Sequence, residues 1–132
     1  MKLILVPDEE LENPGPDQIA ETLHKLRQQE GGAVILVNDQ LGDEFFLQAA
    51  GNPQLGYALE YREGSEEQHF QATEADISVE RLVEAFQKYA SGDSSWKSDF
   101  QWEQMEFKTG KGCLGMMALL AGAGLLAGAL LL

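Results

Sequence analysis

The sequence has very little cysteine and little positive charge. Its one cysteine, Cys113, excludes a disulfide framework within the chain and a zinc site built from cysteines. Nine Lys and Arg stand against 22 Asp and Glu in 132 residues, which gives a formal net charge of −13. Such an anionic protein is a poor partner for DNA or RNA, because each phosphate contact would have to overcome net repulsion. We therefore expect no direct binding of nucleic acid.

Charge of either sign is missing from the end of the chain. All the charged residues lie between Lys2 and Lys111, and residues 112–132 contain none. The chain therefore divides into an acidic domain over 1–107, a short basic hinge over 108–111 and an apolar tail over 112–132. Apolar residues are numerous and regularly spaced in the acidic domain, which argues against disorder. We expect this domain to fold on its own as one unit.

The N-terminus lacks the long apolar stretch of a signal peptide. The apolar run that begins at Leu3 stops at Pro7 and is followed by Asp8 and two glutamates. This pattern predicts a buried first strand. It also predicts that the acidic domain stays on the cytosolic side of a membrane.

Helical and strand periodicities alternate along the acidic domain. Helical spacing follows Pro16 as far as Gly31, and again follows Ser78, a good N-cap, as far as Gly92. Period-two or short apolar runs predict strands over 1–6, 33–37, 43–50, 55–62, 68–73 and 98–107. The order β-α-β-β-β-β-α-β predicts an α+β domain, with a mostly antiparallel sheet and two helices on one side.

A set of short segments is similar to a known family. These segments are Asp-Glu-Phe-Phe-Leu at 43–47, Gly-Tyr-Ala-Leu-Glu-Tyr at 56–61, Ile-Ser-Val-Glu-Arg at 77–81, Gly92, and Trp-Glu at 102–103. Their order and spacing resemble the Imm1 family of bacterial immunity proteins, over residues 33–106. Members of that family neutralise polymorphic toxins, notably nucleic-acid deaminase toxins delivered between competing bacteria.

The resemblance implies a non-enzymatic immunity protein that binds a cognate toxin, without catalytic residues, metal or cofactor. The net negative charge is consistent with this function, because a small acidic protein can occupy the cationic active-site surface of a toxin and associate with it rapidly. Taken alone, the acidity is better explained by solubility, and it is the resemblance that favours the inhibitor function. The alternative function is a small acidic chaperone-like or secretion adaptor that binds a protein client.

Candidate toxin-contacting residues are four acids and one tryptophan: Glu66, Glu67, Asp93, Trp96 and Glu103. Trp96 follows a run of small polar residues, where an aromatic side chain can act as an interface anchor. Packing of Trp96 back over the helix end is an equal alternative.

The two histidines do not indicate an active site. His24 falls in the first predicted helix, beside its charged face. His69 lies at the start of the weak strand predicted over 68–73, just after Glu66 and Glu67, with no nucleophile or third group apparent in the sequence.

The tail is predicted to be a transmembrane helix. As a helix, 112–132 would be about 31 Å long, close to the roughly 30 Å of a bilayer's hydrocarbon core. Lys108 and Lys111 in the hinge precede this segment, as expected for a cytosolic flank. The predicted segment includes Gly112, Leu119, Gly124, Gly128 and Leu132.

Gly124 and Gly128 form a Gly-x-x-x-Gly spacing that permits close helix–helix contact and therefore a homo-oligomer. The uninterrupted apolar length, Lys108 and Lys111 on one flank, the lack of a signal peptide and the acidic domain together favour a protein anchored in the bacterial inner membrane, with its acidic domain facing the cytoplasm. The alternative is an apolar helix buried in the domain or in an oligomer.

Overall fold

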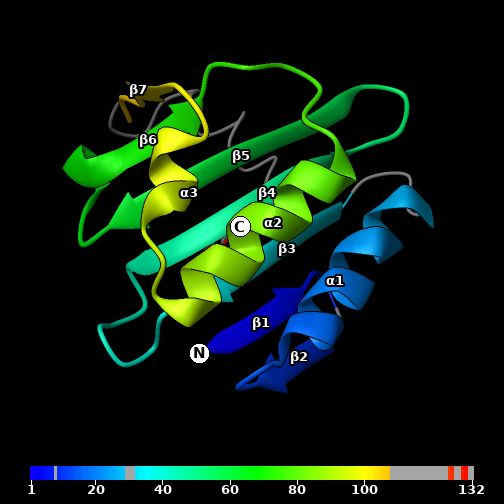
Figure 1. The fold of residues 1–132 in the computed structure, drawn as a ribbon. Coiled ribbons are helices and arrows are strands. Elements are labelled where there is room, and N and C mark those ends of the chain that lie inside the picture. The colour runs from blue at the N-terminus through cyan, green and yellow to red at the C-terminus, as the bar shows by residue number, and fades with distance from the viewer. Residues whose placement is uncertain (8, 29–31, 108–124, 127–128, 131–132) are drawn as a thin grey trace.

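The computed structural model describes residues 1–7, 9–28, 32–107, 125–126 and 129–130. An antiparallel seven-stranded sheet has the order β2-β1-β3-β4-β5-β6-β7 (Figure 1). Its strands are β1 (Lys2–Leu5), β2 (Glu9–Glu12), β3 (Gly32–Val37), β4 (Phe45–Asn52), β5 (Gly56–Glu63), β6 (His69–Ala72) and β7 (Trp102–Gln104). The helices are α1 (Pro16–His24), α2 (Val79–Ser91) and α3 (Ser95–Ser98), with 3-10 turns η1 (Lys25–Gln28) and η2 (Glu66–Gln68).

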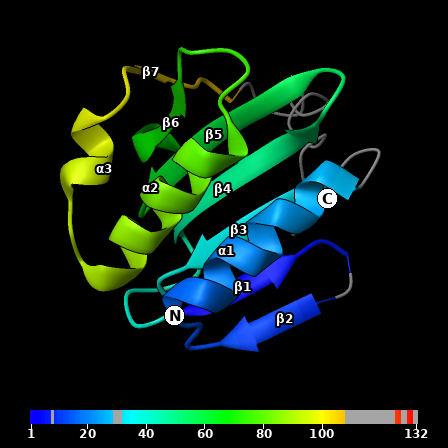
Figure 2. The same ribbon diagram turned by 45° about the vertical axis from the view of Figure 1, so that its right-hand side comes forward.

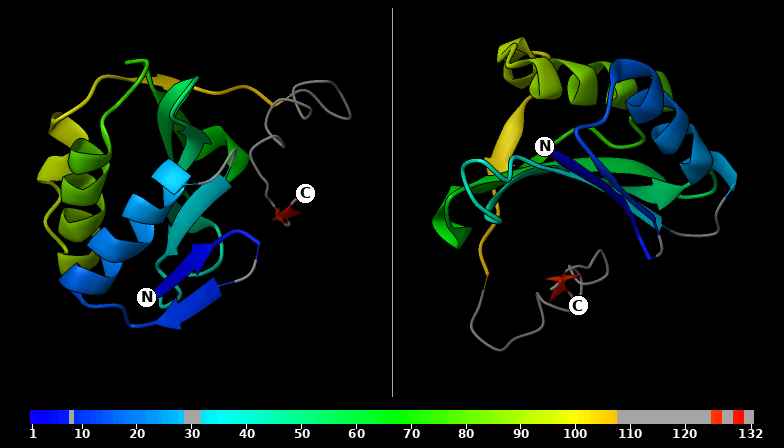
Figure 3. Two further views of the ribbon diagram at one scale, coloured as in Figure 1. Left: turned by 90° about the vertical axis from the view of Figure 1, so that its right-hand side faces the viewer. Right: turned by 90° about the horizontal axis from the view of Figure 1, so that it is seen from below.

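The predicted α+β architecture is confirmed for this part of the chain. Strands β3 to β6 follow one another as an antiparallel meander. Helices α1 and α2 lie side by side on one face of the sheet (Figure 2). A view along the sheet shows that it curves, with its concave side turned away from the helices (Figure 3).

The tail prediction falls mostly on 108–124, 127–128 and 131–132, which lie outside the described residues. Two short strands there, β8 (Leu125–Leu126) and β9 (Ala129–Leu130), pair with each other. Among the described residues, no helix has the length and apolar character needed to cross a membrane.

The second predicted helix begins and ends as its sequence indicates. The Ser78 hydroxyl accepts a hydrogen bond from the Arg81 backbone N–H at 3.2 Å, which satisfies one of the free donors of α2. The helix ends at Gly92, whose φ of +84° is the left-handed conformation that favours glycine. Leu82 and Phe86, on the apolar face of α2, are fully buried.

Two elements were not predicted. Strand β2 contains three glutamates in four residues, so it lacks an apolar pattern. It forms an edge of the sheet, where Glu10 pairs with Lys2 and Glu9 pairs with Lys25. Helix α3 and the chain after it occupy much of the segment predicted as a strand over 98–107, so only Trp102–Gln104 pairs with β6. Leu55, the first residue of the strand predicted over 55–62, instead lies in the β4–β5 turn and is 84% exposed.

The core lies between the sheet and the helices. Tyr57, Tyr61, Phe86 and Phe100 belong to it, whereas Phe45 is only half-buried. Strand residues of the core alternate with residues that face the concave side of the sheet.

Candidate functional site

Trp96, a predicted interface anchor, is buried. It lies in α3, is 5% exposed, and its ring centroid is 5.1 Å from Tyr61, 5.4 Å from Tyr89 and 5.8 Å from Trp102. The alternative, in which Trp96 packs back over the helix end, therefore describes its position. A tryptophan enclosed by other aromatic rings is a core residue, and it offers little surface to a partner.

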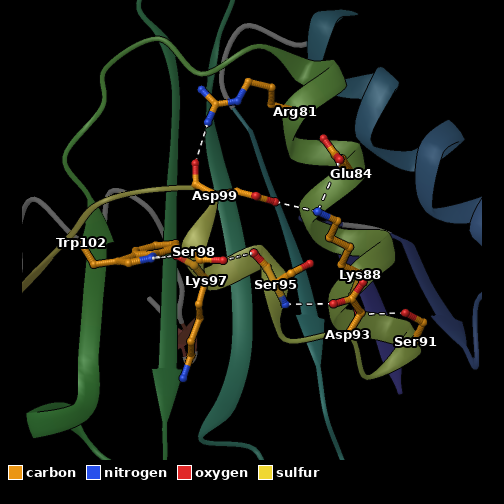
Figure 4. Close-up of polar contacts among 10 residues, drawn as sticks. All are labelled: Arg81, Glu84, Lys88, Ser91, Asp93, Ser95, Lys97, Ser98, Asp99 and Trp102. Carbon is orange, nitrogen blue, oxygen red and sulfur yellow. Dashed lines mark hydrogen bonds and ion pairs between the residues drawn. The ribbon is translucent and has the colours of Figure 1, made fainter.

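Asp93 is exposed in the turn between α2 and α3 (Figure 4). Its Oδ1 accepts a hydrogen bond from the Ser95 backbone N–H at 2.9 Å. This bond, with a further one from the Ser95 side chain, lowers the pKa of Asp93 below its ordinary value. Asp93 therefore stays charged, although part of its hydrogen-bonding capacity serves the turn.

Ion pairs hold the same corner of the fold together. Lys88 Nζ on α2 lies 2.8 Å from Asp99 Oδ2 and 3.5 Å from Glu84 Oε2 (Figure 4). The hydrogen bond to Asp99 raises the pKa of Lys88. Arg81 donates to the Asp99 carbonyl at 3.0 Å. These contacts join α2 to the chain after α3.

Glu66, Glu67 and Glu103 are exposed, and the structure brings the segments that carry them to one edge of the sheet. Glu66 and Glu67 lie in η2, directly before β6, and Glu103 lies in β7, which pairs with β6. The Gln104 side-chain amide donates to the Glu67 carbonyl at 2.6 Å and so ties η2 to β7. We call these three glutamates the β7-edge acids. Asp93, in contrast, belongs to the α2–α3 turn.

Every lysine and arginine in residues 1–107 forms an ion pair with a carboxylate: Lys2, Lys25, Arg27, Arg62, Arg81, Lys88 and Lys97. The acids are in excess, so many exposed carboxylates form no ion pair within the described residues: Glu12, Asp17, Glu21, Asp43, Glu66, Glu67, Asp76, Asp93, Glu103 and Glu106. The surface of this domain is therefore a source of uncompensated negative charge.

A buried charged cluster lies on the concave side of the sheet and was not predicted. His69 and Glu60 are each 4% exposed, and His69 Nε2 lies 2.8 Å from Glu60 Oε1. Arg62 Nε lies 3.0 Å from His69 Nδ1, and Arg62 also pairs with Glu44. Because an arginine N–H can only donate, Nδ1 accepts and Nε2 carries the proton that His69 donates to Glu60.

The sequence signal for this cluster was the strand register. Glu60 and Arg62 are two residues apart on one face of β5, and His69 is the cross-strand partner of Arg62. His69 therefore lies at the start of β6, within the strand predicted over 68–73. Both of its ring nitrogens are engaged by neighbouring side chains, so neither is free to take a proton from a substrate.

No family model, no curated protein and no solved structure matches this chain. Within the described residues, no group of three or more His, Cys, Asp and Glu side chains is arranged to hold a metal ion.

A shallow hollow of about 300 Å³ opens where the β3–β4 turn meets α2 and α3. Leu41, Tyr89 and the paired Glu63 and Lys97 are among its lining residues. Burial, and secondarily the charge of Glu63, raises the pKa of Tyr89 to about 12. The hollow therefore presents a neutral phenol rather than a nucleophile or a base.

We predict that the domain loses stability at high pH through its tyrosines. Burial raises the pKa of Tyr57, Tyr61 and Tyr89, so the folded state favours the neutral phenols. Their stabilisation is complete below the ordinary pKa of 10.0 and is lost as the pH rises towards about 12. Tyrosinate absorbance, recorded with circular dichroism, should appear together with unfolding. Tyr89→Phe should weaken this pH dependence, and tyrosinate formation near pH 10.0 in a folded protein would contradict the prediction.

Proposed function

We propose that this chain is a non-enzymatic immunity protein that binds a cationic bacterial toxin and blocks its active-site surface. The observation that carries the proposal is the complete pairing of the cations in residues 1–107, which leaves exposed carboxylates available to an outside partner. Toxins that act on nucleic acids carry positive charge around their active sites, because they must attract phosphates. The negative surface fits such a target and steers it into an encounter.

The β7-edge acids are the part of this surface that we assign to the toxin. They lie at a sheet edge, where β7 has β6 as its strand partner on one side. Glu66, Glu67 and Glu103 are all exposed and form no ion pair within the described part of the chain. A carboxylate that is already free of a partner does not have to break an ion pair before it binds an arginine or lysine of the toxin.

The resemblance of residues 33–106 to the Imm1 family supports the choice of a toxin of the nucleic-acid deaminase type. We further propose that the tail over 112–132 tethers the protein to the inner membrane, with the acidic domain in the cytoplasm. A tether would raise the local concentration of inhibitor where a toxin enters the cell.

A titration of toxin activity tests the proposal. We expect a gene directly upstream that encodes a large secreted protein with a toxic C-terminal domain. That domain is the partner to titrate, and the readout is its activity on nucleic acid. An inhibitor that occludes the active site should abolish activity at one protein per toxin and should co-purify with it. Inhibition at far less than one equivalent would indicate an enzyme. Binding without inhibition, or an upstream gene for a secretion component, would instead favour the adaptor function.

A further inference from the structure

The two edges of the sheet differ in how their charges are compensated. Strand β2 forms one edge and β7 forms the other (Figure 1). At the β2 edge, Glu9 Oε1 lies 2.8 Å from Lys25 Nζ. Glu10 Oε2 on the same strand lies 3.4 Å from Lys2 Nζ. The β7-edge acids, in contrast, form no ion pair within the part of the chain that the structure describes. A cationic partner therefore meets lysines at the β2 edge and unpaired carboxylates at the β7 edge.

Two hydrogen bonds fix which backbone groups of β7 point towards β6. The Met105 N–H donates to the His69 carbonyl at 2.9 Å. At the other end of the ladder, the Thr73 N–H donates to the Gln101 carbonyl at 2.8 Å. In an antiparallel pair, successive residues alternate, because one turns its N–H and C=O to the partner strand and the next turns them away. Gln101 and Met105 therefore set the alternation for the whole of β7.

The outward-facing backbone groups of β7 belong to Trp102 and Gln104. Glu103 lies between the two inward-facing ends and opposite Gln71, so its N–H and C=O point to β6. Trp102 and Gln104, on either side of it, turn their N–H and C=O groups to the outer edge. Glu103 and Gln104 are exposed and Trp102 is half-buried. Within the described residues, this edge is accessible to an approaching chain.

The charge at this edge indicates what kind of chain fits it. An extended segment of another protein can add to a sheet edge as a further strand, held by backbone hydrogen bonds. The β7-edge acids attract a segment that carries lysine or arginine, and each carboxylate can accept charge-assisted hydrogen bonds from it. They repel an acidic segment, which includes the β7 edge of a second copy of this chain. The edge therefore fits an extended basic segment.

We propose that the toxin is held by strand addition: an extended, lysine- or arginine-bearing segment of the toxin pairs with the outer edge of β7. The backbone groups of Trp102 and Gln104 form hydrogen bonds with the added strand, and the β7-edge acids pair with its basic side chains. This inference rests on the proposed function and names the element of the toxin that the β7 edge recognises.

Amide hydrogen exchange in the full-length protein, alone and in complex with the toxin domain of the titration above, tests strand addition at single residues. The N–H groups of Trp102 and Gln104 should exchange rapidly in the free protein, because they point outward. In the complex they should exchange at least about tenfold more slowly. The Met105 N–H is the internal control. It already donates to the His69 carbonyl, so its exchange should change much less on binding.

The outcomes separate this inference from the proposed function. Inhibition at one protein per toxin, with unchanged exchange at Trp102 and Gln104, would overturn strand addition and leave the immunity function standing. A toxin domain that is neither bound nor inhibited would overturn both. Slow exchange of the same two groups in the free protein would also overturn strand addition. It would assign the edge to a second copy if the protection rose with concentration, and to the chain itself if it did not.

A proline at position 104 provides a second measurement. Gln104→Pro removes an N–H that faces away from β6, so the pairing of β7 with β6 is retained while the outer edge loses a donor. Gln104→Ala is the matched control, because it removes the same side chain, including its hydrogen bond to the Glu67 carbonyl, and keeps the N–H. We expect Gln104→Pro to bind the toxin domain about tenfold more weakly than Gln104→Ala. Circular dichroism in the aromatic range establishes that both variants are folded, and equal affinities of the folded variants would contradict strand addition.

Discussion

Replacing Trp96 with alanine is expected to lower the free energy of unfolding by about 3–5 kcal/mol, the range for truncating a large buried aromatic side chain. Trp96 is 5% exposed and contacts Tyr61, Tyr89 and Trp102. Its removal leaves a cavity between α3 and the sheet and deprives Tyr61 and Trp102 of their edge-to-face contacts with the indole. Denaturant unfolding followed by circular dichroism measures the change.

The control for Trp96→Ala is Leu55→Ala. Leu55 is 84% exposed in a turn, so truncating it removes little buried area, and the expected change is within about 0.5 kcal/mol. The folded Trp96→Ala protein should bind the toxin as tightly as the unaltered protein. A variant that kept its stability and lost toxin binding would reinstate Trp96 as an interface anchor.

Much of the fold could be predicted from the sequence because its central elements are locally consistent. The apolar spacing in α2 coincides with a good N-cap at Ser78 and a stop at Gly92, and the strands of the meander have apolar runs. Strand β2 has no such apolar pattern, and its position is set instead by backbone hydrogen bonds to β1 and by ion pairs with Lys2 and Lys25. Its sequence therefore contains no signal of a strand. Helix α3 is four residues long, too short for its periodicity to be visible.

The candidate site was less predictable because it depends on contacts between distant segments. That acids such as Glu66, Glu67 and Glu103 would be exposed follows from their chemistry, but their assembly at one edge depends on the pairing of β6 with β7. The partners of His69 come from β5, and the burial of Glu60 beside it breaks the usual rule that a strand's charged residues face water. For Trp96, the sequence left two interpretations open, and only the aromatic residues around it decide between them.

The distribution of unpaired charge allows toxin recognition to be separated from general acidity. The β7-edge acids and a second set of exposed, unpaired acids, Glu12, Asp17 and Glu21, lie near opposite edges of the sheet. Replacing either set with lysine changes the net charge by the same amount. The two variants therefore differ only in where the negative charge is removed.

Glu66→Lys, Glu67→Lys and Glu103→Lys together are expected to slow association with the toxin by about tenfold or more at about 0.1 M salt, because they place positive charge against a cationic surface. The control set Glu12→Lys, Asp17→Lys and Glu21→Lys should slow association much less. Its charges lie farther from the β7 edge than the Debye length, which is about 10 Å at 0.1 M salt. Stopped-flow or biosensor measurements across a range of salt concentrations give the rates. The difference between the variants should shrink as salt rises. Equal slowing by both sets would show that net charge alone steers the toxin, and no effect from the β7-edge set would place the toxin on another surface.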